Sequence, residues 1–109
     1  MYFKKLKIYS TKLIGELFEP HILQSFIFSI LEQKEKGIKV DYLQVFELIA
    51  DTENNKLFVK HRQEQTDDTI KFEKTLILKT KNFEFIEYGT KIYIIDDVEH
   101  QTILFSSEY

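Results

Sequence analysis

The fold of this chain is decided by residues 41–51, DYLQVFELIAD. β-Branched and aromatic residues fill the stretch and the turn-forming run DTENN closes it at 51–55, so it is predicted to be a β-strand. Successive side chains of a strand point to opposite faces. One face would carry Tyr42, Gln44, Phe46, Leu48 and Ala50, and the other Leu43, Val45, Glu47 and Ile49. Because both faces are mainly apolar, we expect this strand in the middle of a sheet that is covered on both sides.

The composition predicts one globular domain over residues 1–109. This length is enough for a single core, and 43% of the residues are hydrophobic with only 3 Gly and 1 Pro. The chain has no Cys, which excludes a disulfide framework and thiolate metal sites and fits a reducing compartment. There is no signal-peptide pattern and no apolar run long enough for a bilayer, so we expect a cytoplasmic protein without membrane contact.

Helical periodicity is strongest in residues 20–36. Pro20 suits the first helical position, apolar residues recur at helical spacing, and Gly37 stands where a left-handed cap residue is expected. Two-residue alternation predicts further strands at 5–11, 56–63, 70–79, 91–95 and 101–105, while 81–88 fits either a short strand or a loop. Together these patterns predict an α+β fold, with one main helix packed on an antiparallel sheet of about five or six strands.

Familiar catalytic signatures are absent from the sequence. The three glycines lie far apart, so there is no Gly-rich phosphate loop or nucleophile elbow, and no two histidines have the helical spacing of a zinc site. This weighs against an enzyme, and we expect no cofactor. If the two hairpins lie side by side, imidazoles and carboxylates could still bind a metal or transfer protons. The residues for such a cluster are Glu47, His61, Asp96, Asp97 and His100.

A structural role for the same residues is the alternative. Glu47 would pair with His61 across the central hairpin, or with Arg62 near its rim. Asp96 and Asp97 would then only organise a turn.

Charge is unevenly distributed along the chain, although the net charge is only -3. Four lysines near the start interleave with aromatic residues, which is a pattern that can follow phosphates and stack bases. They are Lys4, Lys5, Lys7 and Lys12, with Phe3 directly before them and Tyr9 among them. The acidic total argues against a nucleic-acid partner. Acidic residues gather near the other end, and they could imitate a row of phosphates and occupy the site of a DNA-handling enzyme. These acids are Asp96, Asp97, Glu99 and Glu108.

A protein interface is a further possibility. Once the main helix covers one face of the sheet, the apolar residues Leu43, Val45 and Ile49 on the other face need a cover. Either the terminal segments of the chain provide it, or another protein does. If that protein is a second copy, the result is a homodimer through the sheet face.

Four segments, taken together, carry a family resemblance. They read DYLQVFEL at 41–48, HRQE at 61–64, KIYIIDD at 91–97 and QTIL at 101–104, with SEY at the end. In this order they resemble the staphylococcal protein family of unknown function numbered 960, and the helix that begins at Pro20 fits as well. The chain departs from the family at Tyr93, where a tryptophan is usual, and at 106–107, where two serines replace an expected proline.

The resemblance implies a small single-domain protein of low-GC Gram-positive bacteria with no established activity. Some similar reading frames lie near the recombinase genes of staphylococcal chromosome cassettes. The predicted interaction residues are Glu47, His61, Arg62, Asp96, Asp97 and Glu99. The leading hypothesis is a non-enzymatic accessory protein that binds another protein through the open sheet face or the acidic terminal hairpin. The alternatives are an acidic decoy of a DNA-handling enzyme and a small enzyme or ligand binder centred on His61.

Overall fold

The predicted main helix is α2, Pro20–Glu35, in a computed structural model that describes residues 7–63, 73–79, 90–96 and 99–109. Pro20 is its first residue, as its fixed φ favours. At the other end Gly37 has a φ of 79°, and its N–H donates to the Lys34 carbonyl over 3.0 Å. The start and stop signals in the sequence therefore define this helix to within one residue.

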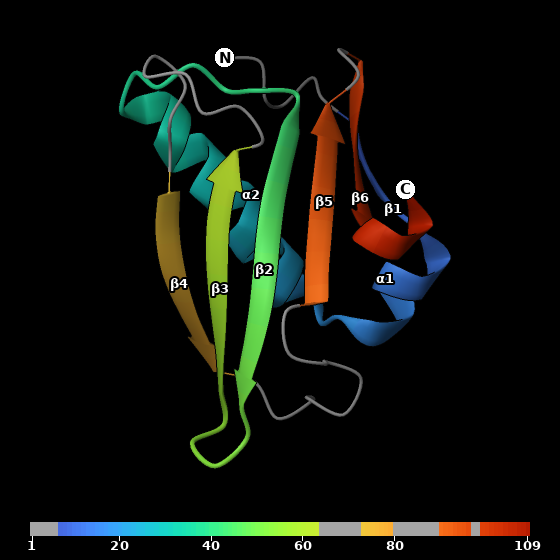
Figure 1. Cartoon of the computed structure of the whole chain (residues 1–109). Coiled ribbons are helices and arrows are strands. Elements are labelled where there is room, and N and C mark those ends of the chain that lie inside the picture. The colour runs from blue at the N-terminus through green and yellow to red at the C-terminus, as the bar shows by residue number, and fades with distance from the viewer. Residues whose placement is uncertain (1–6, 64–72, 80–89, 97–98) are drawn as a thin grey trace.

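Six strands form one sheet that lies against α2 (Figure 1). Their order is β1-β6-β5-β2-β3-β4, so the strand formed by the opening stretch, β2, lies inside the sheet with β5 and β3 beside it. This position agrees with its two apolar faces. The strands are β1 (Lys7–Ser10), β2 (Leu43–Asp51), β3 (Lys56–Gln63), β4 (Glu73–Lys79), β5 (Thr90–Asp96) and β6 (His100–Phe105).

The α+β prediction is confirmed, but the sheet is mixed and not purely antiparallel. β1 pairs in parallel with β6, with Ile8 opposite Gln101, whereas every other neighbouring pair is antiparallel. These two strands come from opposite ends of the chain, so no local turn sets their relative direction. The undecided stretch 81–88 and residues 70–72 of the predicted fourth strand lie outside the described residues.

A short helix, α1 (Lys12–Leu17), has no counterpart in the sequence prediction. Thr11 caps it by accepting a hydrogen bond from the Ile14 N–H at 3.4 Å, and Ile14 is fully buried. Six residues with a glycine among them contain too little periodicity to be recognised. A closing 3-10 turn, η2 (Ser106–Glu108), is tied to α1 because the Glu108 carboxylate accepts from the Thr11 hydroxyl at 2.9 Å.

The core fills the space between α2 and the inner face of the sheet, which is the face that contacts this helix. α2 buries Ile22, Phe26, Ile27 and Ile30 there. The inner face supplies the facing layer, which consists of Phe46, Leu48, Leu57, Val59, Ile92, Ile94, Ile103 and Phe105. Of the helices in the described part of the chain, none is both long enough and apolar enough to traverse a bilayer.

The opposite, outer face of the sheet is more closed than the sequence suggests. Val45 is only 1% exposed and Leu43 is buried too, while Ile49 is half-buried. In register, Val45 stands between Arg62 on β3 and Tyr93 on β5. The expected open row is therefore covered within the chain at two of its three positions.

Candidate functional site

The sheet separates the predicted interaction residues into different places. His61 is fully buried on the inner face, whereas Glu47 and Arg62 are half-buried on the outer face. In register, His61 stands opposite Phe46 and Glu47 stands opposite Lys60, so the proposed pairing of Glu47 with His61 does not form. Asp96 ends β5 and Glu99 precedes β6, both at the end of the last hairpin, and Asp97 lies outside the described residues.

The metal cluster suggested by the sequence is likewise divided. His100 lies on β6 and makes an edge contact with Tyr9, with 5.2 Å between the ring centroids. In the ranges that the structure describes, no three His, Asp or Glu side chains come close enough to bind a metal ion. His61 and Glu47 cannot contribute to one site because they point to opposite sides of the sheet.

His61 is instead the centre of a buried polar chain. Its Nδ1 lies 2.6 Å from the Ser29 hydroxyl, and its Nε2 lies 2.7 Å from the Gln44 side-chain oxygen. The Gln44 amide donates in turn to the Gln63 side-chain oxygen at 2.7 Å. All these directions agree when the Ser29 hydroxyl donates to Nδ1 and the imidazole carries its proton on Nε2. The chain therefore holds a neutral imidazole in a defined tautomer.

The same chain also ties the segment before β2 to the sheet. Gln44 Nε2 donates to the Asp41 carbonyl at 2.8 Å, and Gln63 Nε2 donates to the Lys39 carbonyl at 3.1 Å. The Asp41 N–H donates to the Gln63 side-chain oxygen. These bonds give hydrogen-bond partners to backbone groups that the sheet and the helix do not pair.

Aromatic stacking completes the surroundings of His61. Phe46 stacks on the imidazole with 4.2 Å between centroids, and Phe26 of α2 stacks on Phe46 at 4.6 Å. Burial lowers the pKa of His61 from its ordinary 6.5 to about 3, and the positive charge of Lys74 adds to this shift. His61 is therefore neutral near pH 7 and does not titrate there.

The trio Ser29, His61 and Gln44 links a hydroxyl to an imidazole at hydrogen-bond distance, as a hydrolase triad does, but its third member is a neutral amide and not a carboxylate. All three side chains are buried, however, with Ser29 on the sheet-facing side of α2. A nucleophile needs a reacting atom about 3 Å away, and a buried hydroxyl gives a substrate no access. The arrangement therefore acts in packing and in fixing the position of α2 on the sheet.

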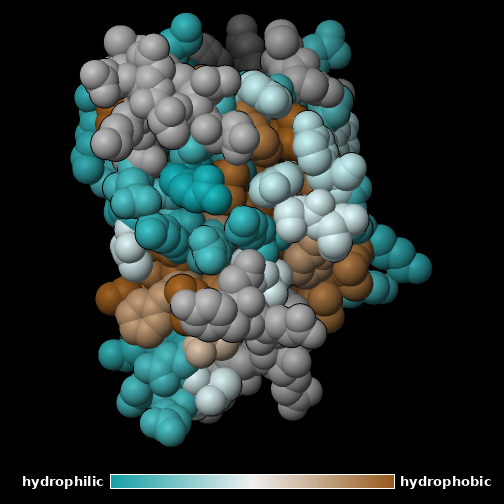
Figure 2. All heavy atoms as spheres, viewed as in Figure 1, coloured by the Kyte–Doolittle hydropathy of each residue, from teal (hydrophilic) through white to brown (hydrophobic). Residues whose placement is uncertain are grey.

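The outer face carries a band of charged residues. Glu47 stands between Lys60 and Lys91 on the two neighbouring strands, and Lys60 also forms an ion pair with Glu73 at 3.6 Å. Figure 2 shows this hydrophilic band across the middle of the outer face. Because both signs alternate, the band presents no extended positive field of the kind that attracts nucleic acid.

Below this band lies an apolar row of three residues, Ile49, Phe58 and Ile77. They stand opposite one another on β2, β3 and β4, and Ile77 is 60% exposed. In Figure 2, hydrophobic residues gather over the lower end of these strands. The sequence analysis did not single out Phe58 and Ile77. The available signal was that each interrupts an otherwise polar strand face.

The acidic residues near the end of the chain have different surroundings. Glu99 is exposed and Asp96 is half-buried. The Glu108 carboxylate accepts hydrogen bonds from the Thr11 hydroxyl and from the Phe105 N–H, each at 2.9 Å. Among the described acids near the end of the chain, Glu108 therefore has a structural role through its hydrogen bonds, while Glu99 is exposed.

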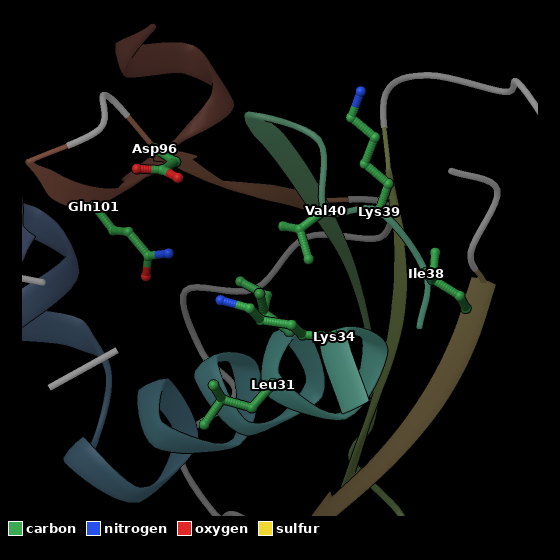
Figure 3. A pocket seen from close by; sticks show the side chains of 8 residues that line it. Leu31, Lys34, Ile38, Lys39, Val40, Asp96 and Gln101 are labelled. Atoms are coloured by element: carbon green, nitrogen blue, oxygen red, sulfur yellow. The ribbon is translucent and has the colours of Figure 1, made fainter. Parts of the chain in front are cut away.

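A cavity of about 370 Å³ lies at the end of the molecule where α2 finishes. It is lined by the last turns of α2, by the segment that leads to β2, and by the ends of β5 and β6 (Figure 3). Asp96 and Gln101 face Lys34 across it. This cavity is the second candidate site besides the apolar row.

Comparison with known proteins identifies the family. Residues 9–108 match the family described as staphylococcal protein of unknown function (DUF960), and the chain belongs to that family. A crystal structure of a protein of unknown function from Enterococcus faecalis is similar, with a TM-score of 0.67 and 24% sequence identity. The match covers 95% of this chain and 91% of that one, and it shows a shared fold. No curated protein matches the chain.

Proposed function

We propose that this member of the family is a non-enzymatic protein-binding module that uses the outer face of its sheet. The observation that carries the proposal is the apolar row Ile49, Phe58 and Ile77, which is contiguous across three strands. Ile77, at the end of this row, is 60% exposed. Contiguous apolar side chains are unfavourable in contact with water, and on a protein surface they commonly mark an interaction site.

The surroundings of the row support a protein partner. The charged band of Glu47, Lys60 and Lys91 borders it, and protein interfaces commonly combine an apolar centre with a polar rim. β4 is the last strand in the sheet order, so a partner strand could also pair with its outer edge. Both features suit a protein better than a small molecule, because the surface is broad.

The partner that we propose is another protein of the host, with a homodimer as the alternative outcome. The resemblance places some relatives near recombinase genes, so the extract to test comes from a low-GC Gram-positive strain that carries such an element. An extract from a strain without it serves as the comparison.

The experiment compares two lysine substitutions at equally exposed apolar positions. Ile77→Lys changes the most exposed member of the row, and Phe28→Lys changes a side chain on α2 that is 63% exposed. Light scattering after size exclusion measures self-association, and affinity capture followed by mass spectrometry measures retention of a host protein. We expect Ile77→Lys to lose the partner and Phe28→Lys to retain it.

Three results would contradict binding of a protein through the apolar row. If Ile77→Lys leaves both self-association and the capture of a host protein unchanged, the row is not the contact surface. If binding instead depends on Asp96 and Glu99, tested by Asp96→Lys and Glu99→Lys, the acidic terminal hairpin is the contact and the decoy alternative gains support. Retention that appears only when nucleic acid is left in the extract would contradict a protein partner.

A further inference from the structure

The two edges of the sheet differ in how open they are to another strand. β1 has only four residues, and the N–H of the next residue, Thr11, already donates to the Ile103 carbonyl at 3.0 Å. β4 is seven residues long and lies at the opposite edge (Figure 1). In the part of the chain that the structure describes, no strand pairs with the outer side of β4. Because an edge strand presents N–H and C=O groups that another chain can pair with, β4 is the edge that can accept a strand.

The second half of β4 has few of the features that discourage such pairing, which include edge lysines, prolines and bulges. The charged residues at its start are held within the chain, since Glu73 pairs with Lys60 at 3.6 Å and Lys74 pairs with Glu32. The remaining residues, 75–79, read TLILK and contain no proline and one charge. The part of β4 that is open to a partner is therefore mostly apolar.

Ile77 is the centre of this open segment. Its side chain lies on the outer face and is 60% exposed, and Thr75 and Lys79 on the same face are exposed too. Leu76 and Leu78 lie on the inner face, where they are half-buried against the core. Because a leucine stands on each side of Ile77, the apolar pattern reads the same in both chain directions. Such symmetry suits an isologous contact, in which the same segment of two copies meets about a two-fold axis.

We propose that β4 pairs with β4 of a second copy of this chain, antiparallel and about a two-fold axis at Ile77. In this register Ile77 faces the partner's Ile77 on the outer face, and Leu76 faces the partner's Leu78 on the inner face. Thr75 faces the partner's Lys79, so no like charges are opposed. The two sheets become one continuous sheet of twelve strands, six from each copy.

Neighbouring registers are less favourable. An axis at Leu76 would place Lys74 against the partner's Leu78, and Ile77 against the partner's Thr75. An axis at Leu78 would place Ile77 against the partner's Lys79. Compared with these two registers, the axis at Ile77 is the one that opposes every apolar residue of 76–78 with another apolar residue.

The pairing would also extend the apolar row of the outer face. Ile49, Phe58 and Ile77 stand opposite one another on β2, β3 and β4, and the partner's Ile77 would continue this row into the second copy. Two rows of three residues would then form one row across six strands. The inference goes beyond the proposed function, because edge pairing uses backbone groups of β4 and leaves the outer face free for another protein.

The first experiment exploits the absence of cysteine from the chain. In the proposed register, the two side chains introduced by Ile77→Cys face each other with their Cα atoms about 4.5–5.5 Å apart, a separation that a disulfide spans. Thr75→Cys is the matched control on the same face, because its two copies would lie about 13 Å apart along the strands. After oxidation with oxidised glutathione, non-reducing electrophoresis should show a linked dimer for Ile77→Cys and a monomer for Thr75→Cys.

A mixture of two variants tests the register itself. Thr75→Cys and Lys79→Cys stand opposite each other across the proposed pair, whereas neither stands opposite its own copy. Oxidation of an equimolar mixture should therefore give the mixed dimer in excess over either homodimer, as measured by intact-protein mass spectrometry.

The second experiment uses the wild-type protein and measures amide hydrogen exchange by NMR over a range of protein concentrations. Alternate N–H groups of an edge strand point away from the sheet. At alternate positions within 75–79, exchange should therefore slow as the concentration rises, while exchange in β1 stays constant. Ile77→Lys would oppose two ammonium groups, and it should lose this concentration dependence.

Ile49→Lys separates this inference from the proposed function. Ile49 lies on β2, two strands from the edge, so the substitution disrupts the apolar row without changing β4. The variant should keep the concentration dependence of exchange in β4, whether or not it still captures a host protein. Loss of the dimer in this variant would show that two copies meet face to face, and it would overturn edge pairing.

Other outcomes would also overturn the pairing of two copies. Equal cross-linking of Ile77→Cys and Thr75→Cys would show that the contacts are random collisions. Exchange in β4 that is the same at every concentration would show that its edge stays open. Protection of β4 that appears only after a host extract is added would mean that the added strand belongs to another protein.

Discussion

The two faces of the β2–β3 hairpin bury their facing side chains to different extents, although each face has a pair that includes a phenylalanine. On the inner face Phe46 stands opposite His61, and both are fully buried. On the outer face Ile49 stands opposite Phe58, and both are only half-buried. The difference is that α2 provides a second layer on one side. Alternation along a strand therefore tells which residues share a face, while the neighbouring layer decides how far that face is buried.

The polar groups of the two faces differ in the same way. Inside, Ser29, His61 and Gln44 satisfy one another because water cannot reach them. Outside, Glu47 and Lys60 keep access to solvent and can exchange partners. Substitutions should therefore have large effects on the inner face and small effects on the outer one.

Phe46→Ala should produce the largest loss of stability. The ring is stacked between Phe26 and His61 and is fully buried, so its removal leaves a cavity. We expect the free energy of unfolding to fall by about 3–5 kcal/mol in urea titrations. Phe28→Ala is the control, and it should change the value by less than about 0.5 kcal/mol. Equal losses in the two variants would mean that the ring stack is not a stabilising centre.

Lowering the pH should produce the next largest loss of stability, through protonation of His61. Because burial lowers its pKa from 6.5 to about 3, the unfolded chain takes up the proton first as pH falls. The contribution of the neutral imidazole is full above pH 6.5, and it is lost progressively toward pH 3, by on the order of 4 kcal/mol.

The variant His61→Gln isolates this contribution from that of the carboxylates. Glutamine can accept from Ser29 and donate to Gln44 but does not titrate. The stability difference between wild type and variant, measured by urea unfolding from pH 7 to pH 3, should therefore change by most of that amount. A constant difference across this range would contradict the lowered pKa.

A smaller effect is expected at the hydroxyl that donates to His61. Ser29→Ala leaves Nδ1 buried without its donor and should cost about 1–3 kcal/mol. Ser25→Ala, one turn earlier in α2, removes a hydroxyl that donates to the His21 carbonyl near the surface. That control should change stability by less than about 0.5 kcal/mol. If both variants are equally mild, the buried chain is not needed to position α2.

Ile77→Thr should have the smallest effect, and it examines the outer face directly. The side chain is exposed and threonine favours strands, so thermal or urea unfolding should shift by less than about 0.5 kcal/mol. A loss above about 1 kcal/mol would show that the apolar row stabilises the fold rather than serving as a contact surface.

Several local features follow from the sequence alone. β3 has its predicted ends, Lys56–Gln63, and the turn before it contains Asn55 at a φ of 53°, which asparagine tolerates. The Asn54 amide donates to the Asp51 carboxylate within the same turn at 2.8 Å. Each of these depends on residues only a few positions apart, and for this reason propensity and spacing were sufficient.

The candidate sites were less predictable than the fold. The sequence placed His61 with the apolar side of its hairpin, which agrees with its burial, but its donor Ser29 lies 32 residues away on another element. Phe58 and Ile77 form their row only because β2, β3 and β4 align in one register. Within the described residues, Gln101 Oε1 lacks a hydrogen-bond donor, and this too depends on what surrounds it in space.

The sequence by itself therefore determined the α+β class, the ends of α2, the central place of β2 and the alternation of each hairpin. The parallel pairing of β1 with β6, the short helix α1, and the closure of the outer face over Val45 were decided by the tertiary structure. The physical reason is the range of the interactions. Hydrophobic period, proline and glycine act within a few residues, whereas pairing direction, burial and hydrogen-bond partners depend on segments that meet only in the folded chain.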